Sequence, residues 1–311
     1  MTSNSRGGRR EAMVDDGNDT YEEYAGLLDA VRGIRWPARS AVRGGIPGAH
    51  TSRLRGISAE FTEYRPYRQG DDPRRIDWKL FARSDRAYIR LSNDRAILPT
   101  MIILDASASM AFPVATLAKW RLAAQVGVGL AAVARNSGDP VGLVIAGDQE
   151  PVLLAPRMRR SVTLEIIRAV GATRPVGSVP LAPSVSIGAK YGGRLVIVSD
   201  FLGDLDETLA VAASWVAAGH DVHAVHVIAR EEIDPSRDAL TVSDPEAPTV
   251  RRALTVATRD VYVAAFGSWR DRIAHELADA GIAYATAVTD EETPEHLIRR
   301  ITALRGAVAI A

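Results

Sequence analysis

Short apolar runs alternate with helix-like segments through the second half of the chain, and this alternation restricts the fold more than any other sequence feature. The runs have the length and composition of buried strands and occupy residues 100–105, 141–147, 151–155, 194–200, 221–228 and 282–288. Helical spacing of apolar residues fills the intervals, at 117–136, 157–171, 182–189, 204–219, 259–280 and 291–305. Strands that alternate with helices predict an α/β domain with a mainly parallel, doubly wound sheet.

Four regions follow one another along the chain. Residues 1–20 are rich in Ser, Gly, Asn, Arg and Asp, and we expect them to be disordered. Residues 21–49 predict a helix and a Gly/Pro loop. Residues 50–98 form an arginine-rich segment with two alternating patterns typical of strands, and residues 99–311 form the α/β domain. The tetrapeptide ALTV stands on both sides of DPEAP within 234–258, which predicts a hairpin inserted in that domain.

The most informative motif follows the first buried run. Asp105, Ser107 and Ser109 stand where this strand ends, and Asp200 ends the run at 194–200. The carboxyl ends of parallel strands open on one edge of the sheet, where open α/β sheets bind their ligands. Carboxylate and hydroxyl oxygens suit a hard cation such as Mg²⁺, with Mn²⁺ or Ca²⁺ as alternatives. The four side chains therefore predict a divalent-metal site with a position left for a partner's carboxylate.

Two competing interpretations concern the same edge of the sheet. The DxSxS pattern also suits a simple strand-to-helix turn, in which Asp105 and the serines cap a helix. His220, His223 and His226 could suggest zinc, but alternate residues of a strand point to opposite faces. Three ligands on one ion would need a bulge in this strand, so we interpret the histidines as core or edge residues.

Composition excludes several classes of protein. The chain has no cysteine, which rules out disulfides, thiolate metal sites and a cysteine nucleophile. Its formal net charge is zero, so the overall charge indicates no nucleic acid partner. No run approaches the ~20 apolar residues that cross a bilayer, and residues 1–20 lack a secretory signal, so we expect a cytoplasmic location without direct membrane insertion. Neither a GxSxG elbow nor a GxxxxGK[ST] phosphate loop occurs, and we therefore expect no enzymatic activity.

A long signature lies between the two predicted strands of the arginine-rich segment. It reads RPYRQGDDPRRIDWK from Arg65 to Lys79 and is followed by Ala82 and Arg83. This run resembles the signature of the DUF58 family, which precedes a von Willebrand factor A-like (vWA) domain with the DxSxS motif. The resemblance covers roughly residues 50–305 and implies a Rossmann-like sheet with a metal-ion-dependent adhesion site (MIDAS). It also implies work with MoxR-type AAA+ ATPases, in systems that mature other proteins or insert their cofactors.

The third metal-binding loop departs from the pattern of the family. Related domains place a threonine there in a Gly-Thr-x-Leu context, whereas this chain has Gly177, Ser178, Val179, Pro180 and Leu181. If Leu181 fixes the register, Val179 takes the place of the threonine, and Ser178 fits only with a shift of one residue. Ser178 is therefore a candidate ligand, although the segment also suits a plain turn.

The signature itself has two physical interpretations. Its charged, glycine and aromatic positions are Arg68, Gly70, Asp71, Asp72, Arg74, Asp77, Trp78 and Arg83. Acids and bases nearly balance within it, which favours an internal ion-pair network that fixes the segment on the α/β domain, with Trp78 as a packing anchor. The alternative is a surface that binds a partner.

The predicted metal site, together with what the resemblance implies, predicts a metal-dependent adaptor or co-chaperone for a MoxR-type AAA+ ATPase. The ATPase or its client would supply the acidic ligand, and the cation could bind in the free protein or only together with the partner. A Mg²⁺-dependent hydrolase that uses Asp105 and Asp200 is the alternative. Binding of nucleic acid by the arginine-rich segment is disfavoured, because acids offset its bases.

Overall fold

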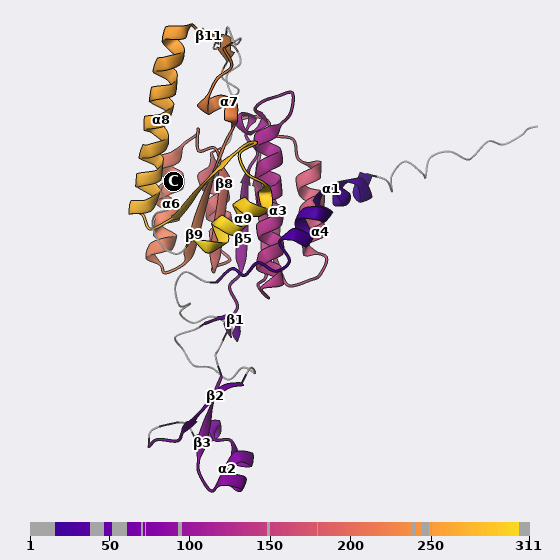
Figure 1. Ribbon diagram of the computed structural model, residues 1–311, viewed down its shortest axis with the longest axis vertical. Coiled ribbons are helices and arrows are strands. Elements are labelled where there is room, and N and C mark those ends of the chain that lie inside the picture. Colours follow the sequence, from indigo (N-terminus) through magenta and orange to yellow (C-terminus); the bar gives the residue numbers. More distant parts are fainter. Residues whose placement is uncertain are drawn as a thin grey trace, which may run out of the picture.

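The structure is a computed structural model, and it describes residues 16–37, 47–51, 61–69, 71, 73–92, 95–147, 150–178, 180–237, 241–243, 249 and 251–304. Its centre is a six-stranded sheet with the order β12–β9–β8–β5–β6–β7 (Figure 1). The strands are β5 (Thr100–Asp105), β6 (Val141–Ala146), β7 (Val152–Arg157), β8 (Arg194–Ser199), β9 (Asp221–Ile228) and β12 (Ala283–Val288). Only the β6–β7 pair is antiparallel within this sheet. The predicted α/β fold class with a mainly parallel sheet is confirmed.

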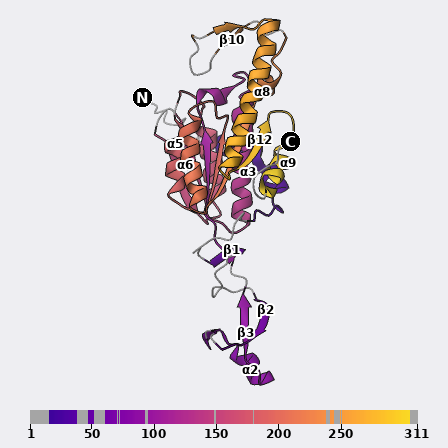
Figure 2. The same cartoon turned by 90° about the vertical axis from the view of Figure 1, so that its left-hand side faces the viewer.

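Helices cover both faces of the sheet, as a doubly wound fold requires (Figure 2). One face packs against α1 (Asp16–Ala30), α3 (Ala118–Asn136), α4 (Val162–Ala172) and α9 (Pro294–Ala303). The other face packs against α5 (Leu181–Ala189), α6 (Leu205–Ala217) and α8 (Val256–Asp279). The strands of the centre are buried along their whole length, which explains why their sequences are continuous apolar runs.

Two glycines of α3 allow this helix to pack closely, Gly127 against β5 and Gly129 against α9. A Cβ atom at Gly127 would lie 2.9 Å from the side chain of Leu104 in β5, and one at Gly129 would overlap Ile298 of α9. Both residues lie inside the helix and not at its start. Gly127-Val-Gly129 is therefore a packing feature and not a phosphate-binding loop.

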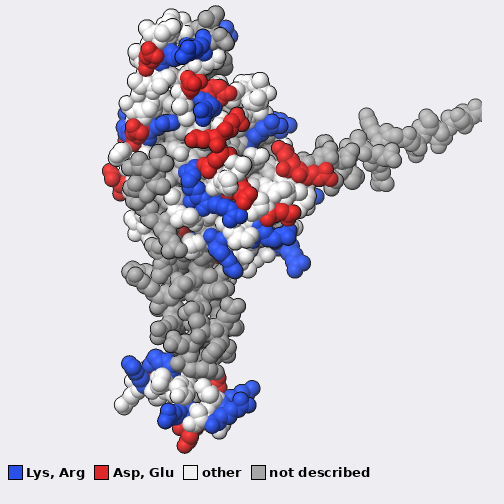
Figure 3. Space-filling view, in the orientation of Figure 1, with Lys and Arg blue, Asp and Glu red and all other residues white. Residues whose placement is uncertain are grey.

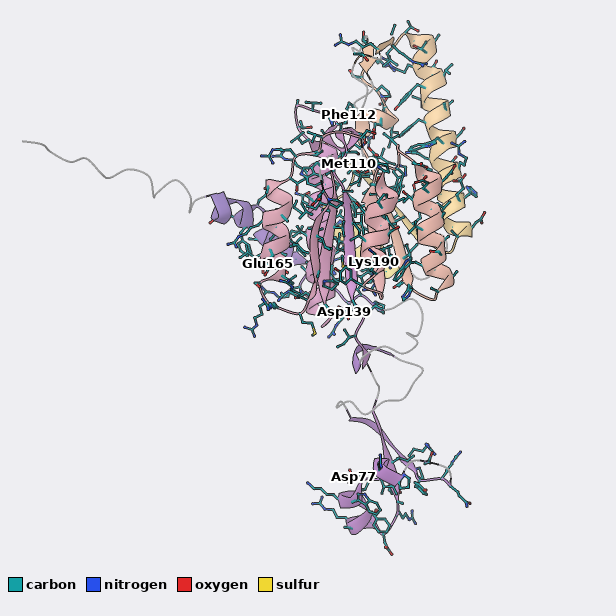
Figure 4. All side chains as sticks on the ribbon, turned by 180° about the vertical axis from the view of Figure 1, so that it is seen from behind. Asp77, Met110, Phe112, Asp139, Glu165 and Lys190 are labelled. Carbon is teal, nitrogen blue, oxygen red and sulfur yellow. The ribbon has the colours of Figure 1, made fainter. Side chains whose placement is uncertain are left out.

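A buried cation holds the amino edge of the sheet together. Arg194, at the start of β8, is completely buried and donates from Nε to Asp221 Oδ2 at 3.2 Å. Its guanidinium lies 4.0 Å from the ring of Trp36 and 3.9 Å from Asp139, which Figure 4 labels at the lower end of the α/β body. The segment that follows α1 is attached to the sheet by this cation–π contact and by hydrogen bonds from Arg194 to the carbonyls of Trp36 and Pro37.

Smaller elements lie at the two ends of the sheet. The short elements are β1 (Pro47–Thr51), β2 (Phe61–Pro66), a 3₁₀ turn at Pro73–Arg75, α2 (Trp78–Ser84), β3 (Tyr88–Ser92), β4 (Arg95–Ala96), α7 (Arg230–Ile233), β10 (Thr241–Ser243) and β11 (Arg251–Ala253). Strands β10 and β11 pair antiparallel, which gives the hairpin expected within 234–258. None of the helices in the described parts of the chain combines the length and apolar character needed to cross a membrane.

Two element boundaries differ from the sequence-based expectations. Helix α1 begins at Asp16, inside the region expected to be disordered, and residues 1–15 lie outside the described residues. Helix α4 begins at Val162 and not at residue 157, because β7 continues to Arg157, which pairs with Val141 of β6. Pairing with a neighbouring strand thus overrides the helical pattern of the local sequence.

The arginine-rich segment forms a small unit of its own, which we call the signature unit: β2, the 3₁₀ turn, α2 and β3. Strands β2 and β3 pair antiparallel, and Ile76 forms an additional bridge to Ile89. The unit is joined to the α/β body beside the amino end of β5, and Figure 1 shows it below that body. Trp78 is 61% exposed, so it is not the packing anchor that we expected.

The acids of the signature unit act locally. Asp71 accepts hydrogen bonds from the Arg65 guanidinium at 2.8 Å and from the backbone N–H of Arg68. Asp77 is the N-cap of α2 and accepts from the N–H groups of Lys79 and Leu80, both at 3.0 Å. Arg68, Arg74 and Arg83 are exposed, whereas Gly70 and Asp72 lie outside the described residues. The printed hydrogen bonds of Asp71 and Asp77 lie within the signature unit, and a network that fixes the unit to the α/β domain stays a prediction.

The N-cap role of Asp77 sets the cost of its removal. We expect Asp77→Ala to destabilise α2 by about 1 kcal/mol, the usual effect of losing an N-cap, and not by the ~3–5 kcal/mol of a broken buried ion pair. Faster amide hydrogen exchange across residues 78–84 would report the change. Asp77→Asn, which keeps an acceptor at this position, should behave like the wild type. A large drop in the melting temperature of the whole protein would contradict the local role.

Candidate functional site

The predicted DxSxS residues meet at the carboxyl edge of the sheet. Asp105 ends β5 and is 7% exposed. Its Oδ1 accepts from the backbone N–H of Ser107 at 2.9 Å, and its Oδ2 accepts from the hydroxyl of Ser199 at 2.6 Å. The hydroxyls of Ser107 and Ser109 lie 3.0 Å apart. Neither Asp105 nor a serine caps the short 3₁₀ turn Ala108–Ala111 through its side chain, so the simple capping interpretation does not apply.

The third loop lies against the DxSxS loop. Val176 donates its backbone N–H to Ala106 at 3.0 Å, and Ala108 donates to the carbonyl of Gly177 at 2.8 Å. Gly177 has a φ of 76°, a conformation that glycine adopts without strain. These bonds bring Ser178 to a cavity of about 140 Å³ that Asp105, Ser107 and Ser199 also line. Val179, which takes the place of the family's threonine if Leu181 fixes the register, lies outside the described residues.

Asp200 is held by a lysine that the sequence did not single out. Lys119, on the first turn of α3, is completely buried and lies 2.6 Å from Asp200 Oδ2. The same ammonium donates to Glu232 of α7 at 2.9 Å. The other Glu232 oxygen accepts from the N–H of Ala229 at 2.7 Å. One ammonium thus connects the start of α3, the end of β8 and α7.

The turn after β8 is fixed by further bonds to the same residues. Ser199 Oγ accepts from the N–H of Phe201 at 2.9 Å, and Asp200 Oδ1 accepts from the N–H of Leu202 at 3.2 Å. Phe201 has a φ of 52°, in the left-handed region that non-glycine residues rarely adopt. Backbone strain of this kind persists where surrounding contacts enforce it, and it is common at binding sites.

Burial changes the proton affinity of these side chains. Burial and the nearby charge of Asp200 raise the pKa of Asp105 to about 6, against the hydrogen bond from Ser199. Burial also raises the pKa of Glu232, although Lys119 opposes this shift. Burial disfavours the Lys119 ammonium, but Asp200 and Glu232 outweigh it and raise the pKa of Lys119. When all four groups are ionised, Asp105, Asp200 and Glu232 carry three negative charges against the one positive charge of Lys119, which contacts only Asp200 and Glu232.

These residues fit a weakly held hard cation. The residues that line the cavity include two carboxylates, Asp105 and Asp204, together with serine hydroxyls, and such oxygen donors suit Mg²⁺ that keeps several waters. Asp204 also caps α6 by accepting from the N–H of Glu207. Among the described residues, no group of three or more His, Cys, Asp and Glu side chains is placed to hold a metal. Asp200 is paired with Lys119, so its role as a ligand, like that of Ser178, stays a prediction.

The histidines of β9 do not converge. His226 is buried beside Phe201 and Trp269, and its Nδ1 lies 2.8 Å from the Tyr284 hydroxyl. Burial lowers the pKa of His226 to about 3, so this ring is neutral. His223 packs against Trp36, from the opposite face. Their separation follows from the alternation of side chains along a strand.

Sequence reasoning missed Lys119, Ser199 and Glu232. Lys119 lies 81 residues from Asp200 and 113 residues from Glu232 in the sequence, so no local pattern relates them. One available signal was the position of Lys119 itself, since it is one of only three lysines and opens an apolar helix. A charged residue at the start of such a helix needs a partner if it is buried.

Comparisons with known proteins give relatives of the chain and of its fold. A family model described as "Protein of unknown function DUF58" matches residues 63–271. Uncharacterized proteins of Mycobacterium tuberculosis and Mycobacterium bovis are 26% identical over 293 residues, which cover 91% of this chain and 92% of theirs.

Similar solved structures include a conserved hypothetical protein, BatB, from Bacteroides thetaiotaomicron. It is 14% identical with a TM-score of 0.43, and the match covers 66% of this chain and 97% of that one. An aerotolerance-related membrane protein from Bacteroides fragilis is 16% identical with a TM-score of 0.42, covering 66% and 96%. The SpRpn10 VWA domain is 14% identical with a TM-score of 0.40, covering 69% and 100%.

The raised pKa of Asp105 predicts that its charge destabilises the metal-free fold. When a carboxyl has a higher pKa in the folded than in the unfolded protein, the free energy of unfolding falls as pH rises between the two values. Here it should fall between about pH 4 and 6, by up to ~3 kcal/mol for a shift of this size. Asp105→Asn keeps the shape and one acceptor, so it should be more stable than the wild type at pH 8 in EDTA. The two proteins should converge at about pH 4 and below, under the unfolded pKa of the carboxyl. Urea denaturation at both pH values measures the difference.

Asp221→Asn is the matched control for this measurement. Asp221 is also buried, but it is paired with Arg194, so its variant should be less stable than the wild type at pH 8. A loss of stability in Asp105→Asn at pH 8 would show that Asp105 serves the fold and not a ligand.

Removing Lys119 should leave Asp200 and Glu232 buried without their cation. We expect Lys119→Met to lower the free energy of unfolding by ~3–5 kcal/mol. Adding Asp200→Asn to that variant should recover part of the lost free energy of unfolding, because it removes one of the two carboxylates that no longer have a cation. Lys190→Met, at an exposed lysine, is the control and should change little. Equal unfolding free energies in Lys119→Met and the wild type would contradict the ion-pair geometry.

Proposed function

We propose that this chain, which belongs to the DUF58 family of proteins of unknown function and matches its model over residues 63–271, is a protein-binding adaptor. In this proposal, the carboxyl edge of the sheet binds an acidic side chain of a partner through a divalent cation. The observation that carries the proposal is the cavity at Asp105. A buried carboxylate there lies beside serine hydroxyls, and the acids Asp105, Asp200 and Glu232 outnumber the one buried cation, Lys119. Buried net charge is costly, and a divalent cation would offset it.

The residues have separate tasks in this proposal. Asp105, Ser107 and Ser109 would hold the cation, with Ser178 as the candidate from the third loop. Ser199 orients the Asp105 carboxylate through its 2.6 Å hydrogen bond. When bound, Mg²⁺, or Mn²⁺ or Ca²⁺ in its place, would supply positive charge and a coordination position for a carboxylate from the partner. Binding of cation and partner is then mutually reinforcing.

The geometry favours binding over hydrolysis. Both Asp200 oxygens are engaged, by Lys119 and by the N–H of Leu202, and both Asp105 oxygens accept hydrogen bonds. Asp200 is not among the residues that line the cavity, and the Asp105 carboxylate that lines it is fixed by two hydrogen bonds, which suits a cation ligand better than a general base. Hydrolysis of a generic phosphate ester that depends on Mg²⁺ and on Asp105 would support the hydrolase alternative.

The identity of the partner rests on the resemblance of the signature. We propose a MoxR-type AAA+ ATPase or its client, with the chain acting as a co-chaperone in the maturation of other proteins. A cytoplasmic location, as expected from the sequence, belongs to the same proposal.

Titration with Mg²⁺ and Mn²⁺ tests the cation site. Calorimetry should show weak binding to the wild type, and the Ser107→Ala/Ser109→Ala variant should bind at least tenfold more weakly because it lacks two hydroxyl ligands. Ser137→Ala removes a hydroxyl at the far end of α3 and should bind like the wild type. The purified ATPase should bind the wild type in Mg²⁺ and much less in EDTA. If the ATPase binds equally well in EDTA and to the double variant, the metal site is not the docking surface.

A further inference from the structure

The signature unit carries an excess of exposed positive charge. Its described side chains between residues 65 and 88 include six basic ones, namely Arg65, Arg68, Arg74, Lys79, Arg83 and Arg86, and three acidic ones, namely Asp71, Asp77 and Asp85. Two of the acids have internal tasks, since Asp71 pairs with Arg65 and Asp77 caps α2. Lys79, Arg83 and Arg86 are exposed, and Figure 3 shows Lys and Arg side chains on both flanks of the unit.

The same helix exposes two large aromatic side chains. Trp78 is 61% exposed and Phe81 is 37% exposed, and their rings lie 6.0 Å apart in an edge-to-face arrangement. The other tryptophans of the chain are buried or half-buried. Exposure of the rings is costly in water, and tryptophan and arginine, which α2 presents as Trp78 and Arg83, are among the residues that dominate protein–protein binding.

We propose that α2 is a docking surface for an acidic face of a partner protein, in which Trp78 and Phe81 enter an apolar depression and Lys79 and Arg83 contact surrounding carboxylates. The charge of the unit selects the acidic partner. The aromatic pair provides the buried centre, and the cations provide steering and a polar rim. Asp77 contributes by fixing the start of the helix that presents both rings.

This surface is separate from the cavity at Asp105. The unit joins the α/β body at the amino end of β5, whereas the cavity lies at the carboxyl end of that strand (Figure 4 labels Asp77 below the body and Met110 near its upper end). The inference therefore does not rest on the proposed cation site, and binding at α2 should not depend on Mg²⁺.

A protein partner fits the unit better than a nucleic acid. Nucleic-acid surfaces gain most of their affinity from many phosphate contacts, and the described excess here is three charges. The pair of exposed rings is edge-to-face, whereas successive bases need open ring faces on which to stack. A nucleic acid is nevertheless a distinct outcome of the experiment below.

Site-specific cross-linking can capture the occupant of this surface. The chain has no cysteine, so Ala82→Cys directs a benzophenone maleimide to one position, one turn from Trp78 on the exposed side of α2. Ala172→Cys, exposed at the end of α4, provides the control position. Each labelled full-length protein is irradiated in an extract of the native host, and products specific to position 82 are identified as protein, nucleic acid or a second copy of the chain.

The captured protein is then purified and titrated against unlabelled variants. We expect Trp78→Ala and Lys79→Glu/Arg83→Glu each to weaken binding at least tenfold, and higher salt to weaken binding of the wild type. Arg159→Glu/Arg160→Glu, a charge reversal at exposed arginines before α4, should change the affinity less than twofold. EDTA should have no effect, which separates this surface from the cation site.

Several results would overturn the inference. The inference is wrong if no protein product is specific to position 82, or if that product is a nucleic acid or a second copy of the chain. It is also wrong if the captured protein binds the α2 variants as tightly as it binds the wild type. Circular dichroism of the variants verifies that the α/β body is folded in each case.

Discussion

An ammonium and a carboxylate that are shielded from solvent and 2.6 Å apart hold the carboxyl edge of this protein together. Lys119 and Asp200 come from α3 and from the end of β8, and Glu232 adds α7 to the same contact. A buried ion pair gains little net stability, because desolvation of both charges offsets their attraction. Its presence is better understood as positioning: it fixes the turn that carries Ser199, and Ser199 in turn orients Asp105.

This arrangement makes the ionised form of Asp105 unfavourable. The carboxylate has hydrogen bonds from Ser107 and Ser199, but Asp200 is nearby and the lysine is engaged with other acids. A group that keeps an unfavourable charge in a cavity lined by hydroxyls is typical of a site shaped for a ligand, where stability is given up for binding. The strained φ of Phe201 at the same turn is consistent with this view.

The two ends of the protein differ in charge for topological reasons. The carboxyl ends of the parallel strands gather Asp105 and Asp200, because each strand passes into a loop at that edge. The signature unit leaves from the other edge, beside the start of β5, and carries the exposed cations. At that same edge, Arg194 is paired internally with Asp221 and lies on Trp36, so its charge serves the fold and not a partner. The cavity at Asp105 and the docking surface that we propose on α2 therefore lie at opposite ends of the protein.

The amino-acid sequence determined the features that depend on residues close together in the chain. Continuous apolar runs marked the buried strands, and the rule that parallel strands end on one edge placed Asp105, Ser107, Ser109 and Asp200 together. Tertiary structure alone decided that Asp200 is paired with Lys119 and that Asp105 is held by Ser199, because 81 and 94 residues separate these partners. It also decided that Trp78 is exposed, since an aromatic residue beside charged neighbours suits a core as well as a surface until the packing of the segment is known.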